Sequence, residues 1–165
     1  MLFKIIISLG ASAVLTLSTV SFAEQQILQL TPVVQQSKGS QVQLQVSYDI
    51  SDAKAVTGIG IRVHYDAQQL SFNKVSGVLL DGLQAIGKPQ PDQADYDNDP
   101  DTDTYLVLAW MDLNGHWPSS ALPTDLFQIT FNTTSQHNER SAVRISATST
   151  ASGYTLQANP VWIEP

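Results

Sequence analysis

Apolar and polar residues alternate along most of the sequence. In residues 41–50, QVQLQVSYDI, every second side chain is apolar. If this segment is an extended strand, one of its faces carries the apolar side chains Val42, Leu44, Val46, Tyr48 and Ile50. The same period of two recurs in segments 57–66, 125–134 and 141–150. Each of these segments is predicted to be a strand with one face buried.

Residues 105–111, YLVLAWM, form a continuous apolar run, which predicts a central strand covered on both sides. Shorter strand candidates lie at 26–32, 70–80 and 154–165. No window after residue 23 has a helical period, and Gly, Pro, Asn and Asp turns join the segments. The pattern predicts an all-β sandwich of eight or nine strands in a single domain.

The first 23 residues have the three parts of a secretory signal peptide. Lys4 supplies the positive charge, an apolar stretch follows, and Ser21, Phe22 and Ala23 form a small-x-small cleavage site. We expect cleavage after Ala23, so that residues 24–165 make up the exported domain, in the periplasm or outside the cell. The alternative is an uncleaved N-terminal membrane anchor. No stop-transfer segment follows, so we expect no membrane insertion after cleavage.

Composition narrows the class of partner. The chain carries 15 acidic and 8 basic residues, for a formal charge of −7, so nucleic acid and anionic lipid are unsuitable ligands. It contains no Cys, so no disulfide stabilises the exported fold. A large core or a bound metal is the other means of stabilising it.

Segment 92–103, DQADYDNDPDTD, contains six Asp residues and no basic residue. On an extended strand, alternating carboxylates lie about 7 Å apart, and each pair costs roughly 0.6 kcal/mol in water. Alternating oxygen donors suit Ca²⁺, which accepts 6–8 oxygen ligands. We therefore predict a structural calcium loop whose ligands are Asp95, Asp97, Asp99, Asp101 and Asp103. Asp92 and Asp112 are weaker candidates.

Other interpretations of this segment stay open. It is not an EF-hand, because Pro100 stands where the loop needs Gly and Leu106 where it needs Glu. A solvated acidic loop without a metal is the alternative to calcium. The nearby DLNG, residues 112–115, suits a simple Asx turn better than a second set of ligands.

No convergent catalytic set is visible, so we predict that the chain is not an enzyme. The three His residues are scattered, and the alternating Asp residues lack the apolar neighbour that would raise one pKa for acid–base work. Among the aromatic residues, Trp117 is the best candidate for a surface ring that binds a ligand, and Tyr96 and Tyr105 are the next. An equally good interpretation has Trp117 folded over the acidic loop.

Several segments resemble cohesin domains. Residues 56–79 resemble the cohesin pattern of an amphipathic strand, a Tyr-Asp turn (YDAQQL), a second strand and a Gly bend. Residues 122–134 and 147–163 are similar to later cohesin strands. DYDNDPDTDTY (95–105) and AWMDLNGHWP (109–118) resemble a narrower group of cohesin-like modules in exported bacterial proteins. The resemblance implies a jelly-roll sandwich of the type shared with carbohydrate-binding modules.

The resemblance also implies a binding role without catalysis. Two partners remain open: a polysaccharide held by Trp117, Tyr96 or Tyr105, or an extracytoplasmic protein that contacts the solvent side of strand 42–50. Alternatives to a binding module are a glycoside-acting enzyme and a purely structural component of the cell envelope. No dockerin-type repeat or enzymatic domain accompanies the module in this sequence, so a cellulosome-like role does not follow.

Overall fold

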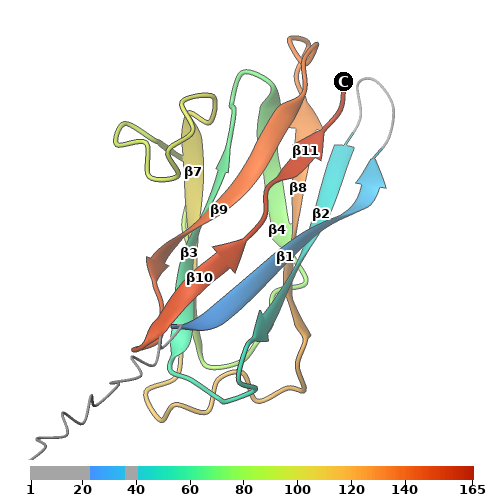
Figure 1. Ribbon diagram of the computed structural model, residues 1–165. Helices are drawn as coiled ribbons and strands as arrows, with labels where there is room; N and C mark the ends of the chain where they lie inside the picture. Colours follow the sequence, from blue (N-terminus) through green and yellow to red (C-terminus); the bar gives the residue numbers. More distant parts are fainter. Residues whose placement is uncertain (1–22, 36–40) are drawn as a thin grey trace, which may run out of the picture.

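The computed structural model describes residues 23–35 and 41–165. They form two facing β-sheets and no helix, the all-β sandwich that the alternation predicts (Figure 1). The expected signal peptide falls on residues 1–23, of which all but Ala23 lie outside the described part. No helix in the described ranges is long and apolar enough to cross a membrane.

The first sheet has five strands in the order β10-β1-β2-β8-β4. In chain order its members are β1 (Glu24–Gln35), β2 (Gln41–Ile50), β4 (Leu70–Ser76), β8 (Thr124–Thr133) and β10 (Tyr154–Ala158). β1 pairs with β10 in parallel, and the other pairs are antiparallel.

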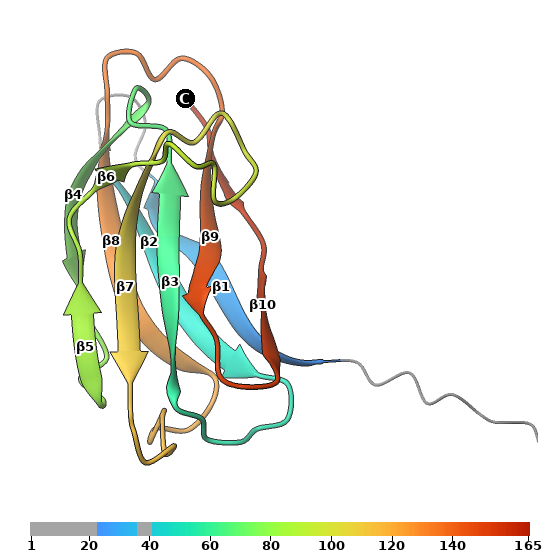
Figure 2. The same cartoon turned by 90° about the vertical axis from the view of Figure 1, so that its left-hand side faces the viewer.

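The second sheet has six strands and follows the order β11-β9-β3-β7-β5, with the short β6 also pairing with β7 (Figure 2). Its members are β3 (Gly58–Tyr65), β5 (Leu83–Ile86), β6 (Gln90–Pro91), β7 (Thr104–Met111), β9 (Ser141–Ser149) and β11 (Val161–Ile163). The described residues form eleven strands, more than the eight or nine expected. The short strands β5, β6 and β11 account for the difference, because segments too short to show alternation still pair at the sheet edges.

The core lies between the sheets and contains the side chains that the period of two selects. Every second residue of β2 is buried, from Val42 to Ile50. The inward side chains of β3 and β8 complete the two walls of the core. Trp110 is buried there as well, and its ring stacks on Phe127 at a centroid distance of 5.8 Å.

β7 departs from the expectation of a strand covered on both sides. Leu106, Leu108 and Trp110 point into the core, whereas Val107 and Ala109 on the outer face are only half-buried. An apolar run therefore does not guarantee two covered faces, since apolar side chains also remain at protein surfaces.

β7 also separates the two segments with candidate chemistry. The acidic segment 92–103 precedes β7 at one end of the sandwich, and segment 112–123 follows it at the opposite end (Figure 2). Eight strand residues place these ends more than about 20 Å apart. Side chains of the two segments consequently belong to different sites.

Candidate functional site

The acidic segment 92–103 folds as consecutive turns rather than as an extended strand. Asp95 and Asn98 have positive φ angles of 50° and 55°, a conformation that Asn and Asp tolerate better than most residues. The amide of Asp92 donates to the carbonyl of Asp103 at 2.7 Å, which closes the base of the loop. The turns aim successive carboxylates in different directions, unlike the alternation of a strand.

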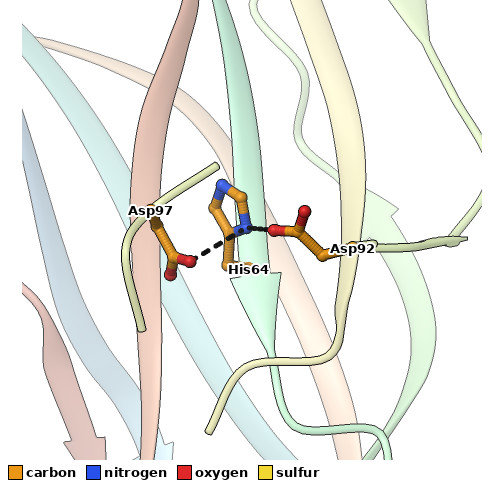
Figure 3. A group of neighbouring side chains, drawn as sticks. All are labelled: His64, Asp92 and Asp97. Atoms are coloured by element: carbon orange, nitrogen blue, oxygen red, sulfur yellow. Dashed lines mark ion pairs between the residues drawn. The ribbon is translucent and has the colours of Figure 1, made fainter. Parts of the chain in front are cut away.

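The loop packs on His64, which projects from the outer face of β3 (Figure 3). The Nδ1 atom of His64 lies 2.9 Å from Asp92 Oδ2 and 3.7 Å from Asp97 Oδ1. The exposed side-chain fractions are 0% for His64, 0% for Asp92 and 4% for Asp97. Two carboxylates and an imidazole therefore share a site that solvent hardly reaches.

Further hydrogen bonds orient these three side chains. Ser146 of β9 contacts His64 Nε2 through its hydroxyl at 2.7 Å. Thr102 donates its hydroxyl to Asp97 Oδ2 at 2.9 Å, and the amide of Tyr96 lies 3.3 Å from both oxygens of Asp92. Burial lowers the pKa of His64, while the charges of Asp97 and Asp92 act in the opposite direction.

Two arginines supply positive charge to the same loop. Arg144 of β9 pairs through Nε with Asp99 Oδ2, and the Asp99 side chain is only 12% exposed. The guanidinium of Arg62 lies 3.9 Å from the centre of the Tyr96 ring and donates to the carbonyl of Ala147. Protein cations from two neighbouring strands thus offset part of the repulsion among the carboxylates.

The five predicted calcium ligands have separate environments. Asp97 faces His64 and Asp99 faces Arg144, whereas Asp103 Oδ1 accepts from the amide of Ala67 at 2.8 Å. Asp95 and Asp101 are exposed. The structure does not gather the five carboxylates around one point, and calcium binding stays a prediction.

A cavity of about 250 Å³ adjoins the outer side of the acidic loop. Acidic side chains from three loops line it: Asp66, Asp99, Asp101, Asp103 and Glu139. The hydroxyl of Ser141 and the amide oxygen of Gln69 are buried in its lining without a hydrogen-bond partner. This cavity is the part of the loop region best supplied with oxygen donors for a hard cation.

Asp112 does not belong to the acidic loop, because β7 separates the two. Its carboxylate accepts hydrogen bonds from the amides of Asn114 and His116, each at 2.9 Å. These two backbone hydrogen bonds lower the pKa of Asp112. The simple Asx turn expected for DLNG is the arrangement observed.

The expectation that Trp117 offers a surface ring is wrong. Trp117 is 0% exposed and packs in the core, with its ring centroid 4.6 Å from that of Tyr48 and 6.3 Å from that of Trp110. It follows β7, whereas the acidic loop precedes β7, and its backbone bridges Val56 just before β3, so it does not cover that loop either. The polar NGH sequence before it indicated a surface turn, but the isolated bridge of Trp117 with Val56 draws the ring inward.

Tyr96 and Tyr105 lie together above His64. Tyr96 is 48% exposed, and its ring meets that of Tyr105 edge-on at 5.7 Å. The Tyr105 ring centre lies 5.6 Å from that of His64. Arg62 covers one face of Tyr96, so this pair closes the His64 site and offers little free ring surface.

Sequence reasoning missed His64 as a partner of the acidic loop. A signal was present: Arg62 and His64 are the two basic side chains on the polar face of one strand, and six nearby carboxylates lacked a local cation. Pairing them required knowing that the loop folds back over β3, which no local pattern states.

Exposed apolar side chains gather on the second sheet. Leu83 of β5 and Met111 of β7 are cross-strand partners with exposed fractions of 65% and 47%. Leu80 and Leu113, in the adjoining loops, are more than 80% exposed. The sequence analysis proposed the solvent side of β2 as a contact surface for a protein. Unlike the exposed apolar residues of β5 and β7, that side is polar and rich in glutamine.

The structure resembles solved cohesins. The sixth cohesin of scaffoldin B from Acetivibrio cellulolyticus, solved with a Cel5 dockerin, matches with a TM-score of 0.56 and 17% identity, over 87% of this chain and 99% of that one. The Coh-OlpA–Doc918 cohesin–dockerin complex from Clostridium thermocellum matches with a TM-score of 0.54 and 12% identity, over 87% and 99%. The third cohesin of ScaC from Acetivibrio cellulolyticus, in complex with the ScaB dockerin, reaches 0.53 and 10%, over 86% and 97%.

These likenesses confirm the prediction of a cohesin-like jelly-roll sandwich. No protein-family model matches the chain, and no curated protein matches it in sequence. At identities below 25%, the similarity establishes the fold alone.

Proposed function

We propose that this chain is an exported, non-catalytic binding module of the cohesin type, and that its partner is a dockerin-type protein domain. The three solved cohesins reported above are each described in complex with a dockerin. The signal-like residues 1–23 support export. The observation that carries the proposal is the exposed apolar strip on the second sheet of a cohesin fold.

The strip consists of Leu83, Ala85, Ala109 and Met111, which form two cross-strand pairs of β5 and β7. β5 is the edge strand of its sheet, so the strip continues to a free edge. Contiguous apolar surface of this kind is typical of contact sites between proteins. A flat apolar strip without a deep cleft suits a folded protein better than a sugar chain.

A polysaccharide partner is the second candidate, and one observation favours it. Tyr96 keeps an exposed ring edge beside a cavity of about 290 Å³ whose lining also includes Asp97, Asn98 and Ser146. Aromatic rings beside polar groups suit sugars. Because Arg62 occupies one face of the ring, the stacking area left for a sugar is small.

The test measures binding of the full chain to a panel of purified dockerin domains, beside a glycan array. Met111→Asp places a charge in the strip and should weaken dockerin binding at least tenfold. Val33→Asp is the matched control, because Val33 is 51% exposed on the other sheet. Binding that Val33→Asp weakens equally, or a silent dockerin panel, would contradict the proposal. A glycan signal that Tyr96→Ala abolishes would favour the polysaccharide.

Calcium stabilisation is the second part of the proposal, located at the cavity lined by Asp66, Asp101 and Asp103. A ligand at 100 times its Kd stabilises a fold by roughly 2.7 kcal/mol, so the melting temperature of the chain should rise with Ca²⁺ and fall with chelator. Asp101→Asn should reduce that rise. If Ca²⁺ and chelator leave the melting temperature unchanged, the outer side of the loop is only solvated.

A further inference from the structure

We infer that His64, Asp92 and Asp97 form a binding site for a divalent transition-metal ion of the zinc class. The site is distinct from the calcium cavity, because it lies under the acidic loop rather than on its outer side. The inference does not depend on which partner the module binds. It rests on ligand geometry, on unpartnered buried atoms and on the charge of the site.

The geometry suits a small cation. The candidate ligand atoms are His64 Nδ1, Asp92 Oδ2 and Asp97 Oδ1, and all lie within 4.8 Å of one another (Figure 3). Tetrahedral zinc binds N and O at about 2.0–2.2 Å, which requires donors about 3.3–3.6 Å apart. The separations from Nδ1, 2.9 and 3.7 Å, bracket that requirement. Among residues 23–35 and 41–165, no other group of three His, Asp or Glu side chains has its ligand atoms this close together.

Buried polar atoms in the site lack hydrogen-bond partners. Asp97 Oδ1 and His64 Nδ1 are both unpartnered, although their side chains are only 4% and 0% exposed. The contact between Nδ1 and Asp92 is short but not aligned as a hydrogen bond. Leaving such buried atoms unpaired is unfavourable, and a metal ion between them would satisfy all three ligands at once.

The charge of the site also favours a bound cation. Two carboxylates are buried side by side, and isolated buried carboxylates are costly. The nearby cations are committed elsewhere: Arg144 to Asp99, and Arg62 to Tyr96 and the carbonyl of Ala147.

The surrounding residues already hold the ligands in place. Ser146 fixes His64 through Nε2, leaving Nδ1 free, and Thr102 holds the second oxygen of Asp97. Bound metals usually have such outer contacts, which set the orientation of the ligands. Asp97 and Ser146 also line the cavity of about 290 Å³, so this cavity adjoins the site.

The ligand types decide which metal class is suitable. Ca²⁺ and Mg²⁺ prefer oxygen ligands, whereas an imidazole nitrogen suits Zn²⁺ and its neighbours among the transition metals. The site should therefore select Zn²⁺ or Co²⁺ over Ca²⁺. A water molecule would complete the coordination of a tetrahedral ion.

The experiment is a calorimetric titration of the untagged full chain with Zn²⁺, in the presence of excess Ca²⁺. We expect one Zn²⁺ per chain, with affinity at least tenfold lower in Asp97→Asn. This variant keeps the size of the side chain and the contact with Thr102. Asp95→Asn is the matched control, since this exposed carboxylate belongs to the same loop but to neither the zinc site nor the calcium cavity. It should bind Zn²⁺ as the unmodified chain does.

Co²⁺ provides a second readout that does not depend on the affinity of a single variant. Bound Co²⁺ should show the strong visible absorption of a tetrahedral site, and Asp92→Asn and Asp97→Asn should each remove it. Circular dichroism of the metal-free variants establishes that they are folded. Absence of Zn²⁺ binding at micromolar concentration, or equal losses in Asp95→Asn and Asp97→Asn, would overturn the inference. Competition by equimolar Ca²⁺ would also overturn it.

Discussion

The two ends of β7 have similar sequences and different structures. The acidic segment 92–103 and segment 112–117 both contain Asp, Asn and one aromatic residue, although the first has six Asp and the second only one. In the first segment, Asp97 and Asp99 reach partners on β3 and β9. In the second, the Asp112 carboxylate accepts hydrogen bonds from amides of its own turn.

The aromatic residues show the reverse arrangement. Trp117, after the local turn, is fully buried against Tyr48 and Trp110. Tyr96, in the loop with long-range partners, remains 48% exposed. The acidic segment is thus attached to the sandwich by charges, and segment 112–117 by an aromatic anchor. Similar composition therefore does not indicate which kind of contact holds a loop.

Replacing the aromatic anchors should produce the largest difference between the two ends. Trp117→Ala removes a fully buried ring, so we expect a loss of about 3–5 kcal/mol in the free energy of unfolding. Tyr96→Ala removes an exposed ring with one Arg62 contact and should cost less than about 1 kcal/mol. Urea unfolding measures both. Similar losses would mean that the two aromatic residues do not differ as anchors.

Unfolding at alkaline pH compares one buried tyrosine near each end of β7. Burial raises the pKa of Tyr48, and of Tyr65, to about 12, and the charge of Asp103 also raises that of Tyr65. Between pH 10 and about pH 12, the unfolded chain loses these protons and the folded chain keeps them. Stability is therefore complete below pH 10 and declines as pH rises, by up to about 2.7 kcal/mol per tyrosine.

Single substitutions show how much of this loss of stability comes from each of the two tyrosines. Tyr65→Phe should remove its share of the pH dependence in urea unfolding. Asp103→Asn should lower the pKa of Tyr65, followed by tyrosinate absorbance, and leave that of Tyr48 unchanged. A shift in Tyr48 of the same size would show that the two ends are electrostatically coupled.

Neutralising the arginine under the acidic loop should have a smaller effect. Arg144→Met leaves Asp99, which is 12% exposed, without its charged partner, and should cost about 1–2 kcal/mol. Arg140→Met is the control, because Arg140 and Glu164 form a pair that is 55% and 61% exposed and contributes under about 1 kcal/mol. Thermal unfolding of both variants measures the difference. Equal stability of the two would show that the loop does not depend on Arg144.

Much of the fold followed from local pattern. The alternation in β2, β3 and β8 identified the core-facing side chains correctly, because a pleated strand must turn every second residue to the same face. It did not predict that His64 of β3, and Leu126 and Thr130 of β8, are buried as well. The Asx turn at Asp112 was also predictable, since its partners lie within four residues. Such features depend only on neighbours in the chain.

The candidate site could be predicted from the sequence less well than the fold. The acidic segment was recognised as chemically unusual, but its partners His64 and Arg144 lie about 30 to 45 residues away in the sequence. Residues that contribute opposite charge from distant strands leave no local pattern. The exposure of Trp117 was mistaken for a similar reason, because its contacts with Tyr48 and Val56 come from other strands.

By itself, the sequence determined the all-β architecture, the identity of the core faces and the presence of an acidic segment without a local counter-charge. Only the tertiary structure decided that this segment folds over His64 and that Trp117 enters the core. It also decided that exposed apolar residues gather along β5 and β7. The physical reason is range: strand periodicity is set by backbone geometry between neighbouring residues, whereas the partners of a charge or a ring are set by packing between strands far apart in the chain.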